Sequence, residues 1–132
     1  DVFPVTQEYI NKEIGSCPVE NGEGLSIRKG AFTRVTLGWG ELKTEAEIID
    51  TRFFSCPAEG AGYQCGSAGC VVLVAINGRI RPLGNMQGWQ IIETRHENII
   101  LGHKHGINCN TAGSVTCYGA YSWNGEGFLS LK

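Results

Sequence analysis

The feature that most constrains the fold is a short unit that occurs twice. Cys70 and Cys117 each begin a run rich in apolar residues that reaches an Asn-Gly pair seven residues later, at Asn77 and Asn124. An Asn-Gly pair between such runs is the strongest local signal for a β-hairpin, because both central residues of a type I′ turn have positive φ. In both copies an earlier cysteine precedes the run across a segment that contains Ala-Gly; these cysteines are Cys65 and Cys109. The chain is therefore expected to use a cysteine-closed loop, a strand and a tight hairpin twice.

The similarity between the two copies extends into their flanks. An apolar doublet precedes each cysteine pair, Ile48-Ile49 in the first copy and Ile99-Ile100 in the second. These matches predict an internal duplication with halves 47–83 and 98–131. A third Asn-Gly pair, at Asn21, is either a degenerate third copy of the turn or a chance likeness in a chain with 19 glycines, and chance is favoured.

The remaining pattern predicts a mainly β chain with one short amino-terminal helix. Residues 5–14 carry apolar side chains at mostly four-residue offsets, with Thr6 as a candidate cap and Gly15 as the stop. Short apolar or β-branched runs separated by Gly, Asn and Pro then fit an antiparallel sandwich or barrel-like sheet better than an α/β arrangement. The segment 45–54 also admits a partly helical interpretation. The predicted strands are 25–28, 32–37, 45–54, 71–76, 79–83, 90–94, 98–101, 118–123 and 127–131.

The six cysteines favour disulfide bonds and an oxidising compartment, either a periplasm or the extracellular space. The repeat narrows the possible pairings to two local loops and one long-range bond. Zinc is the alternative, but no pair has the two-residue spacing of a zinc knuckle and no histidine flanks the cysteines as in a zinc finger. The expected pairs are Cys17–Cys56, Cys65–Cys70 and Cys109–Cys117.

Length and charge exclude several classes of function. The 132 residues fit a single domain, 1–132, with a core of its own. A formal charge of −2 gives no general attraction to polyanions, so nucleic-acid binding is disfavoured. The longest apolar run, 70–76, is far shorter than the roughly 20 residues of a membrane-spanning helix. No glycine-rich phosphate cradle leads from a strand into a helix, and no cofactor is expected.

Three histidines form the most suggestive cluster for chemistry. On a strand, His103 and His105 would face the same side and share one metal ion, with His96 or Glu97 returning from across a hairpin. Gly102 and Gly106 flank the pair, however, and favour an exposed loop. The cluster defines the alternative function, a small metal- or carboxylate-dependent hydrolase. Enzymatic activity is the less favoured hypothesis, because no catalytic residue is specified and no two carboxylates are placed at a working separation by sequence.

The tryptophans lie beside glycines or turns. Trp89 and Trp123 are expected in the core. Trp39, between Gly38 and Gly40, is the best candidate for an exposed aromatic that anchors a partner or stacks on a sugar, although core burial is the commoner fate of tryptophan.

The segment Cys65-Gly-Ser-Ala-Gly-Cys70 resembles the cysteine-closed protruding loop of the periplasmic inhibitors of vertebrate-type lysozyme, which plug the enzyme's active-site cleft with such a loop. Only the cysteine pair carries over, because this loop lacks the histidine and the acid that those inhibitors present. The loop, strand and Asn-Gly arrangement is also similar to that of secreted bacterial disulfide-containing β domains of uncharacterised function. The resemblance implies a periplasmic or secreted protein.

We therefore expect an exported, non-catalytic binding or inhibitor module. Rigid loops at one end of a disulfide-stapled scaffold reduce the ordering cost of binding a protein or glycan partner. The candidate contacts are Ser67, Ala68, His103, His105 and Trp39.

Overall fold

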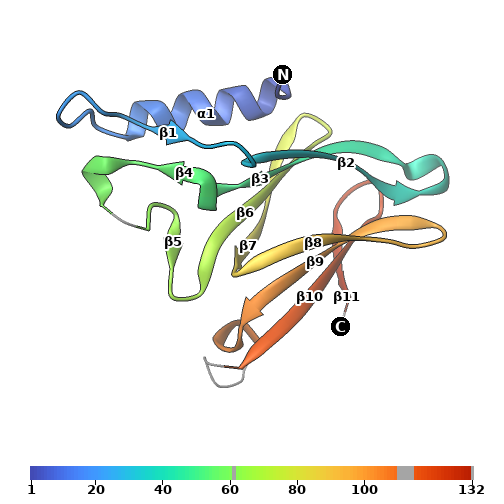
Figure 1. Ribbon diagram of the computed structural model, residues 1–132. Helices are drawn as coiled ribbons and strands as arrows, with labels where there is room; N and C mark the ends of the chain where they lie inside the picture. The colour runs from blue at the N-terminus through green and yellow to red at the C-terminus, as the bar shows by residue number, and fades with distance from the viewer. Residues whose placement is uncertain (61, 110–114, 132) are drawn as a thin grey trace.

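The computed structural model describes residues 1–60, 62–109 and 115–131, which form three layers (Figure 1). Helix α1 (Pro4–Ser16) lies across one face of an antiparallel sheet, and a second group of strands packs on the other face. A ribbon of β1 (Ser26–Ile27) and β4 (Phe54–Ser55) runs beside the helix. The predicted class, mainly β with one amino-terminal helix, is confirmed.

The second and larger sheet contains nine strands. These are β2 (Phe32–Trp39), β3 (Thr44–Asp50), β5 (Cys65–Gly66), β6 (Gly69–Ile76), β7 (Arg79–Met86), β8 (Gly88–Glu93), β9 (Glu97–His105), β10 (Thr116–Trp123) and β11 (Phe128–Leu131). Short 3₁₀ turns η1 to η4 cover Gly40–Leu42, Thr51–Phe53, Pro57–Glu59 and Gly106–Cys109. The turn η2 divides the predicted strand 45–54 into β3 and β4.

The large sheet curls into a half-barrel because the chain passes from one group of strands to the other at two corners. Its order is β11-β10-β9-β2-β3-β6-β5, with β7 paired to β6 and β8 paired to β9. A single residue, Gln87, separates β7 from β8, so one continuous run leaves the side of β6 and joins β9. At the other corner, β2 pairs with β3 over residues 32–37 and with β9 at residues 38 and 39. The strands β8 to β11 are thereby folded over β2, β3, β6 and β7.

Two hydrophobic cores lie on opposite faces of the central strand β6. Val72, Val74 and Ile76 enter the core enclosed by the half-barrel. Leu73 and Ala75 enter the core beneath α1. Burial on both faces explains why this strand has a continuous apolar run in place of alternation. The half-barrel core also contains Leu37, Ala46, Ile48, Met86, Ile100, Tyr121 and Trp123.

The helix begins earlier than predicted and is capped differently. Phe3 is the N-cap residue without a side-chain hydrogen bond, and Pro4 occupies the first turn, where its fixed φ suits a helix start. Thr6 lies inside the helix and is buried, so its prediction as the cap is wrong.

The Asn-Gly pairs differ in their turns. Asn77 and Gly78 both have positive φ, as the type I′ prediction requires. Asn124 instead accepts hydrogen bonds through its side chain from the amides of Glu126 and Gly127, which makes a longer turn. Asn21 and Gly22 also have positive φ between two bridged residues, so this third pair forms a tight turn as well.

All six cysteines are paired, and the three predicted disulfides are present. The large sheet contains two antiparallel meanders with the same strand order. One consists of β3, β6 and β7, and the other of β9, β10 and β11. The duplication itself stays a prediction. No helix in the described part of the chain is long and apolar enough to cross a membrane.

A buried carboxylate on β3 fastens the amino terminus to the sheet. Glu47 is only 2% exposed and accepts hydrogen bonds from the Phe3 amide at 3.0 Å and from Arg34 Nε at 2.9 Å. The Arg34 guanidinium also lies 4.0 Å from the centre of the Phe3 ring and donates to the Asp1 carbonyl. Burial opposes ionisation of Glu47, but these hydrogen bonds and the arginine charge outweigh it and lower the pKa of the carboxyl.

Replacement of Glu47 should weaken both stability and its dependence on pH. The folded pKa lies below the unfolded value of about 4.3, so the stabilisation is fully present above that pH and is lost as pH falls through the folded pKa. We expect Glu47→Gln to lower the free energy of unfolding at pH 7 by about 2 kcal/mol and to flatten the acid limb in urea titrations. The exposed neighbour Glu45 provides the control, since Glu45→Gln should change neither. An acid limb of unchanged slope in Glu47→Gln would contradict the assignment.

Candidate functional site

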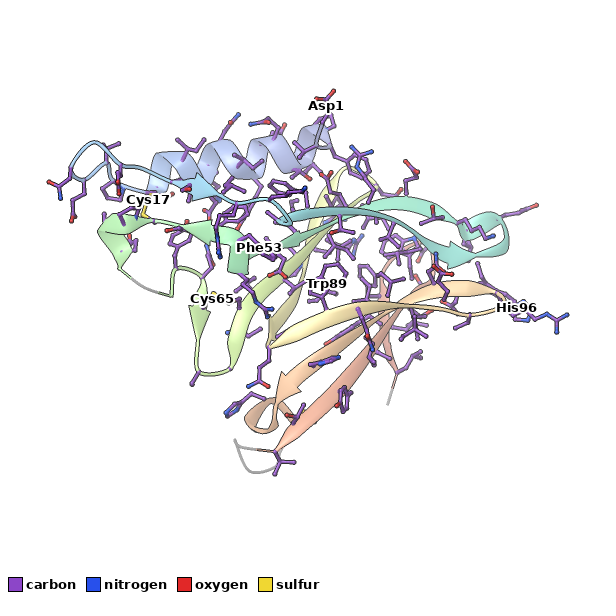
Figure 2. The ribbon with its side chains drawn as sticks, in the orientation of Figure 1. Asp1, Cys17, Phe53, Cys65, Trp89 and His96 are labelled. Carbon is purple, nitrogen blue, oxygen red and sulfur yellow. A yellow bond between two sulfur atoms is a disulfide. The ribbon has the colours of Figure 1, made fainter. Side chains whose placement is uncertain are left out.

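The predicted site residues fall into two groups, which lie at opposite ends of β9. His96 directly precedes β9 and Trp39 pairs with its first residue, whereas His103 and His105 lie at its far end. Seven residues of extended chain place His96 about 23 Å from His103. Figure 2 shows His96 and Cys65 on opposite sides of the molecule.

The structure therefore does not assemble the three histidines that define the hydrolase alternative. Within the described ranges, no group of three or more His, Cys, Asp or Glu residues is placed to hold a metal ion. The prediction that His103 and His105 lie in a loop is also wrong, because β8 and β10 pair with this part of β9. Gly102 does not break the strand; a Cβ there would lie 2.7 Å from the Met86 sulfur, so the glycine makes room for a core side chain.

Four of the five predicted binding residues lie at one end, which we call the cysteine-loop end. It consists of the β5–β6 hairpin, residues 65–70, and the adjoining ends of β9 and β10, residues 103–105 and 115–118. Ser67 and Ala68 form the two-residue turn of the hairpin, and Ser67 is exposed. The Cys65–Cys70 disulfide joins two directly opposed residues of this hairpin. Both parts project to the same side of the molecule (Figure 1).

Backbone contacts hold the two parts of the cysteine-loop end together. Gly69 has a φ of +105°, and a Cβ on it would lie 2.1 Å from the Met86 carbonyl oxygen. The amide of the next residue, Gln87, donates to the His103 carbonyl at 2.7 Å. The hairpin thus rests on the β7–β8 corner, and that corner is hydrogen-bonded to β9. These backbone contacts therefore place Ser67 and His103 at the same end of the molecule.

An exposed tyrosine adjoins His103 on the outer face of the sheet. Tyr118 is directly opposite His103 in the β9–β10 register, and the two rings meet edge to face with centroids 5.1 Å apart. Tyr118 is 60% exposed, and Val115 beside it is also exposed. His103 Nε2 is shielded from solvent and has no hydrogen-bond partner among the residues that the structure describes. Residues 110–114 of the Cys109–Cys117 loop lie outside those residues.

Tyr118 was not among the candidate contact residues that the sequence suggested. The alternation of side chains along β10 predicts that Tyr118 faces outward. Tyr121 and Trp123 are buried on the inner face, and residues an odd number of positions away from them lie on the outer face.

A buried glutamate on α1 fixes the segment that leads into the β5–β6 hairpin. Glu13 is 8% exposed and accepts hydrogen bonds from the Tyr63 hydroxyl at 2.8 Å, from the Tyr9 hydroxyl at 3.2 Å and from the Gln64 side-chain amide. Burial and the neighbouring Glu13 charge raise the pKa of both tyrosines. The phenols therefore remain protonated donors, and the chain is anchored immediately before Cys65.

Removal of this carboxylate should loosen the hairpin. We expect Glu13→Ala to lower the free energy of unfolding by about 2 kcal/mol, because three donors lose one charged acceptor. Amide hydrogen exchange in residues 63–66 should accelerate in the same variant. Glu8→Ala, at an exposed position on the same helix, is the control and should leave both measurements unchanged. Slow exchange in 63–66 despite the substitution would show that Glu13 does not position the hairpin.

The second group lies where β2 meets the start of β9. Trp39 is 53% exposed, contrary to the commoner fate of tryptophan, and its ring meets that of His96 edge to face at 5.4 Å. An open pocket of about 270 Å³ is lined by polar and charged residues next to this pair: Thr36, Gly38, Lys43, Thr94, Arg95, His96, Glu97 and Asn98. Trp39 is therefore brought together with His96 and not with the cysteine-loop end.

The other two tryptophans pack in or against the half-barrel core, as predicted. Trp123 is fully enclosed. Trp89 is partly buried against the same core, and its indole N–H donates to Asp50 at 3.0 Å, which joins β8 to the end of β3.

Comparison of the chain with protein-family models, with curated proteins and with solved structures gives no match.

Proposed function

We propose that this chain is an exported, non-catalytic binding module that engages a protein partner through the cysteine-loop end. The observation that carries the proposal is the backbone contact between the β5–β6 hairpin, the β7–β8 corner and β9, which places the exposed Ser67 and Tyr118 at the same end of the molecule. Tyrosine is a frequent interface hot spot, and a pre-ordered loop lowers the ordering cost of binding. Three disulfides support an oxidising, periplasmic or extracellular location.

An inhibitory role is the more specific form of this proposal. A disulfide-closed loop that projects from a β scaffold resembles the loop by which periplasmic inhibitors block vertebrate-type lysozyme, so that enzyme is the first defined partner to test. The hydrolase alternative gains no support from the geometry, since His96 lies at the other end of β9 from His103 and His105.

The test compares variants at the two ends of β9. Tyr118→Ala and Ser67→Arg alter the cysteine-loop end, and Trp39→Ala removes an equally exposed aromatic at the opposite end. Binding to vertebrate-type lysozyme, and to proteins captured from extracytoplasmic extracts, should fall about tenfold or more in the first two variants and remain at the wild-type level in Trp39→Ala. A partner lost in Trp39→Ala and retained in the other two would contradict the proposal.

A glycan-binding role is the second candidate, and the exposed Trp39 favours it. Aromatic faces beside polar groups suit sugar rings, and the pocket next to Trp39 supplies lysine, arginine, threonine and asparagine side chains. If a glycan is the ligand, Trp39→Ala should abolish retention on glycan-coated surfaces while Tyr118→Ala behaves as wild type. Retention that is unaffected by Trp39→Ala would exclude this site.

A further inference from the structure

A third surface lies between the two hairpins that contain the repeated Asn-Gly pairs. These hairpins are at the ends of β6 and β10 that are opposite the cysteine loops. An open pocket of about 380 Å³ lies there, lined by Arg79, Ile80, Arg81, Pro82 and Phe128. The arginines come from β7, directly after the first hairpin, and Phe128 begins β11, directly after the second. This site shares no residue with the surfaces described above.

Both arginines face the half-barrel side of β7. Arg79 is opposite Ile76 and Arg81 is opposite Val74 in the β6–β7 register, and both partners enter the half-barrel core. Residues opposed in an antiparallel pair share a face, so the two guanidinium groups lie on the same side of the sheet. Two positive charges therefore line one small pocket.

The position of Arg81 is fixed by an aromatic ring. Its guanidinium carbon lies 5.2 Å from the centre of the Trp123 ring, a cation–π arrangement. Gly127 of the second hairpin lies close by, since a Cβ at that position would be 3.9 Å from Arg81 Nη1, at van der Waals contact. The ring of Trp123 thus holds the guanidinium in place where it lines the open pocket.

Neither arginine has an anionic partner in the described part of the chain. Arg81 Nε is shielded from solvent and has no hydrogen-bond acceptor there. The one ion pair found among the described residues joins Arg34 to Glu47, on another part of the molecule. The donors of the two arginines that line the open pocket therefore have no anion in the described part of the chain to neutralise them, and an anion that enters the pocket would supply one.

We propose that this pocket binds the carboxylate or phosphate group of a small anionic ligand. The planar guanidinium of Arg81 matches two oxygens of such a group, and Arg79 supplies a second positive charge. Phe128 contributes an apolar wall for the ligand's remaining atoms. The volume lies at the lower end of the range for small-molecule pockets, which suits a compact ligand.

The test follows the arginine Nε–H signals by NMR while inorganic phosphate or acetate is added at constant ionic strength. The Arg81 signal should shift and saturate with a dissociation constant on the order of 1 mM, and the stronger of the two anions identifies the preferred group. Arg81→Lys keeps the charge but loses the planar fork, and we expect it to weaken binding about tenfold. Arg79→Gln should weaken binding severalfold.

Arg28 provides the matched control, since it also lies over an aromatic ring, that of Phe53, at 5.4 Å, but lines no part of this pocket. Arg28→Lys should leave the titration unchanged. A linear, non-saturating shift of the wild-type Arg81 signal with both anions would overturn the proposal, as would equal weakening by Arg28→Lys. The wild-type titration does not depend on how well any variant folds.

Discussion

Replacement of both Cys17 and Cys56 by serine should lower the free energy of unfolding by about 4 kcal/mol. These cysteines are 39 residues apart and join the end of α1 to the segment after β4, and both are buried. Closing a loop of this length removes a large part of the entropy of the unfolded chain. The core beneath α1 would also lose the link that holds the helix against the sheet. Urea denaturation monitored by circular dichroism measures the difference.

The matched control is the double serine variant of Cys65 and Cys70, whose loop spans only 5 residues. The same entropic argument gives about 2 kcal/mol for that bond. The long-range disulfide should therefore contribute about twice as much stability as the local one. Equal losses in the two variants would mean that α1 is held mainly by its packing and by the Glu47 and Glu13 hydrogen bonds.

Gly69→Ala should cost about 3 kcal/mol or more and displace the β5–β6 hairpin. The φ of +105° is unfavourable for alanine, and its Cβ would lie 2.1 Å from a backbone oxygen, that of Met86, which no side-chain rotation relieves. The Gln87–His103 backbone hydrogen bond lies next to this contact. Denaturation measures the loss of stability, and faster amide exchange at Gln87 reports the displacement.

Gly66 is the control for this substitution because it lies in the same hairpin. A Cβ on Gly66 meets no atom within 4 Å, and its φ lies outside the left-handed region. Gly66→Ala should therefore change the free energy of unfolding by less than about 0.5 kcal/mol. If Gly66→Ala and Gly69→Ala behaved alike, the hairpin would not be mounted rigidly on the β7–β8 corner.

Local sequence patterns were sufficient to predict those elements whose own residues show a clear spacing or composition. The apolar run of β6, the Asn77-Gly78 turn and the three disulfides follow from spacing alone. The same patterns cannot show which face of β6 meets α1 and which meets β9, because both faces are equally apolar. That choice depends on where the helix and the β8–β11 strands pack.

The candidate sites depended on long-range pairing, and there the sequence was less informative. Gly102 suggested a loop around His103, although it serves to accommodate Met86 from a distant strand. His96 and His103 are close in sequence, but an extended strand carries them to opposite ends of the fold. The exposure of Trp39 likewise results from the corner at which β2 leaves β3 for β9.

Site-specific photo-crosslinking tests the central claim most directly. A benzophenone amino acid placed at Ser67 or Val115 samples the cysteine-loop end, and the same probe at Trp39 samples the opposite end of β9. In the native extracytoplasmic compartment, the first two positions should give a crosslink to one common protein, and position 39 should give none to that protein. A crosslink to that protein from position 39 alone would show that the cysteine-loop end is not the binding surface.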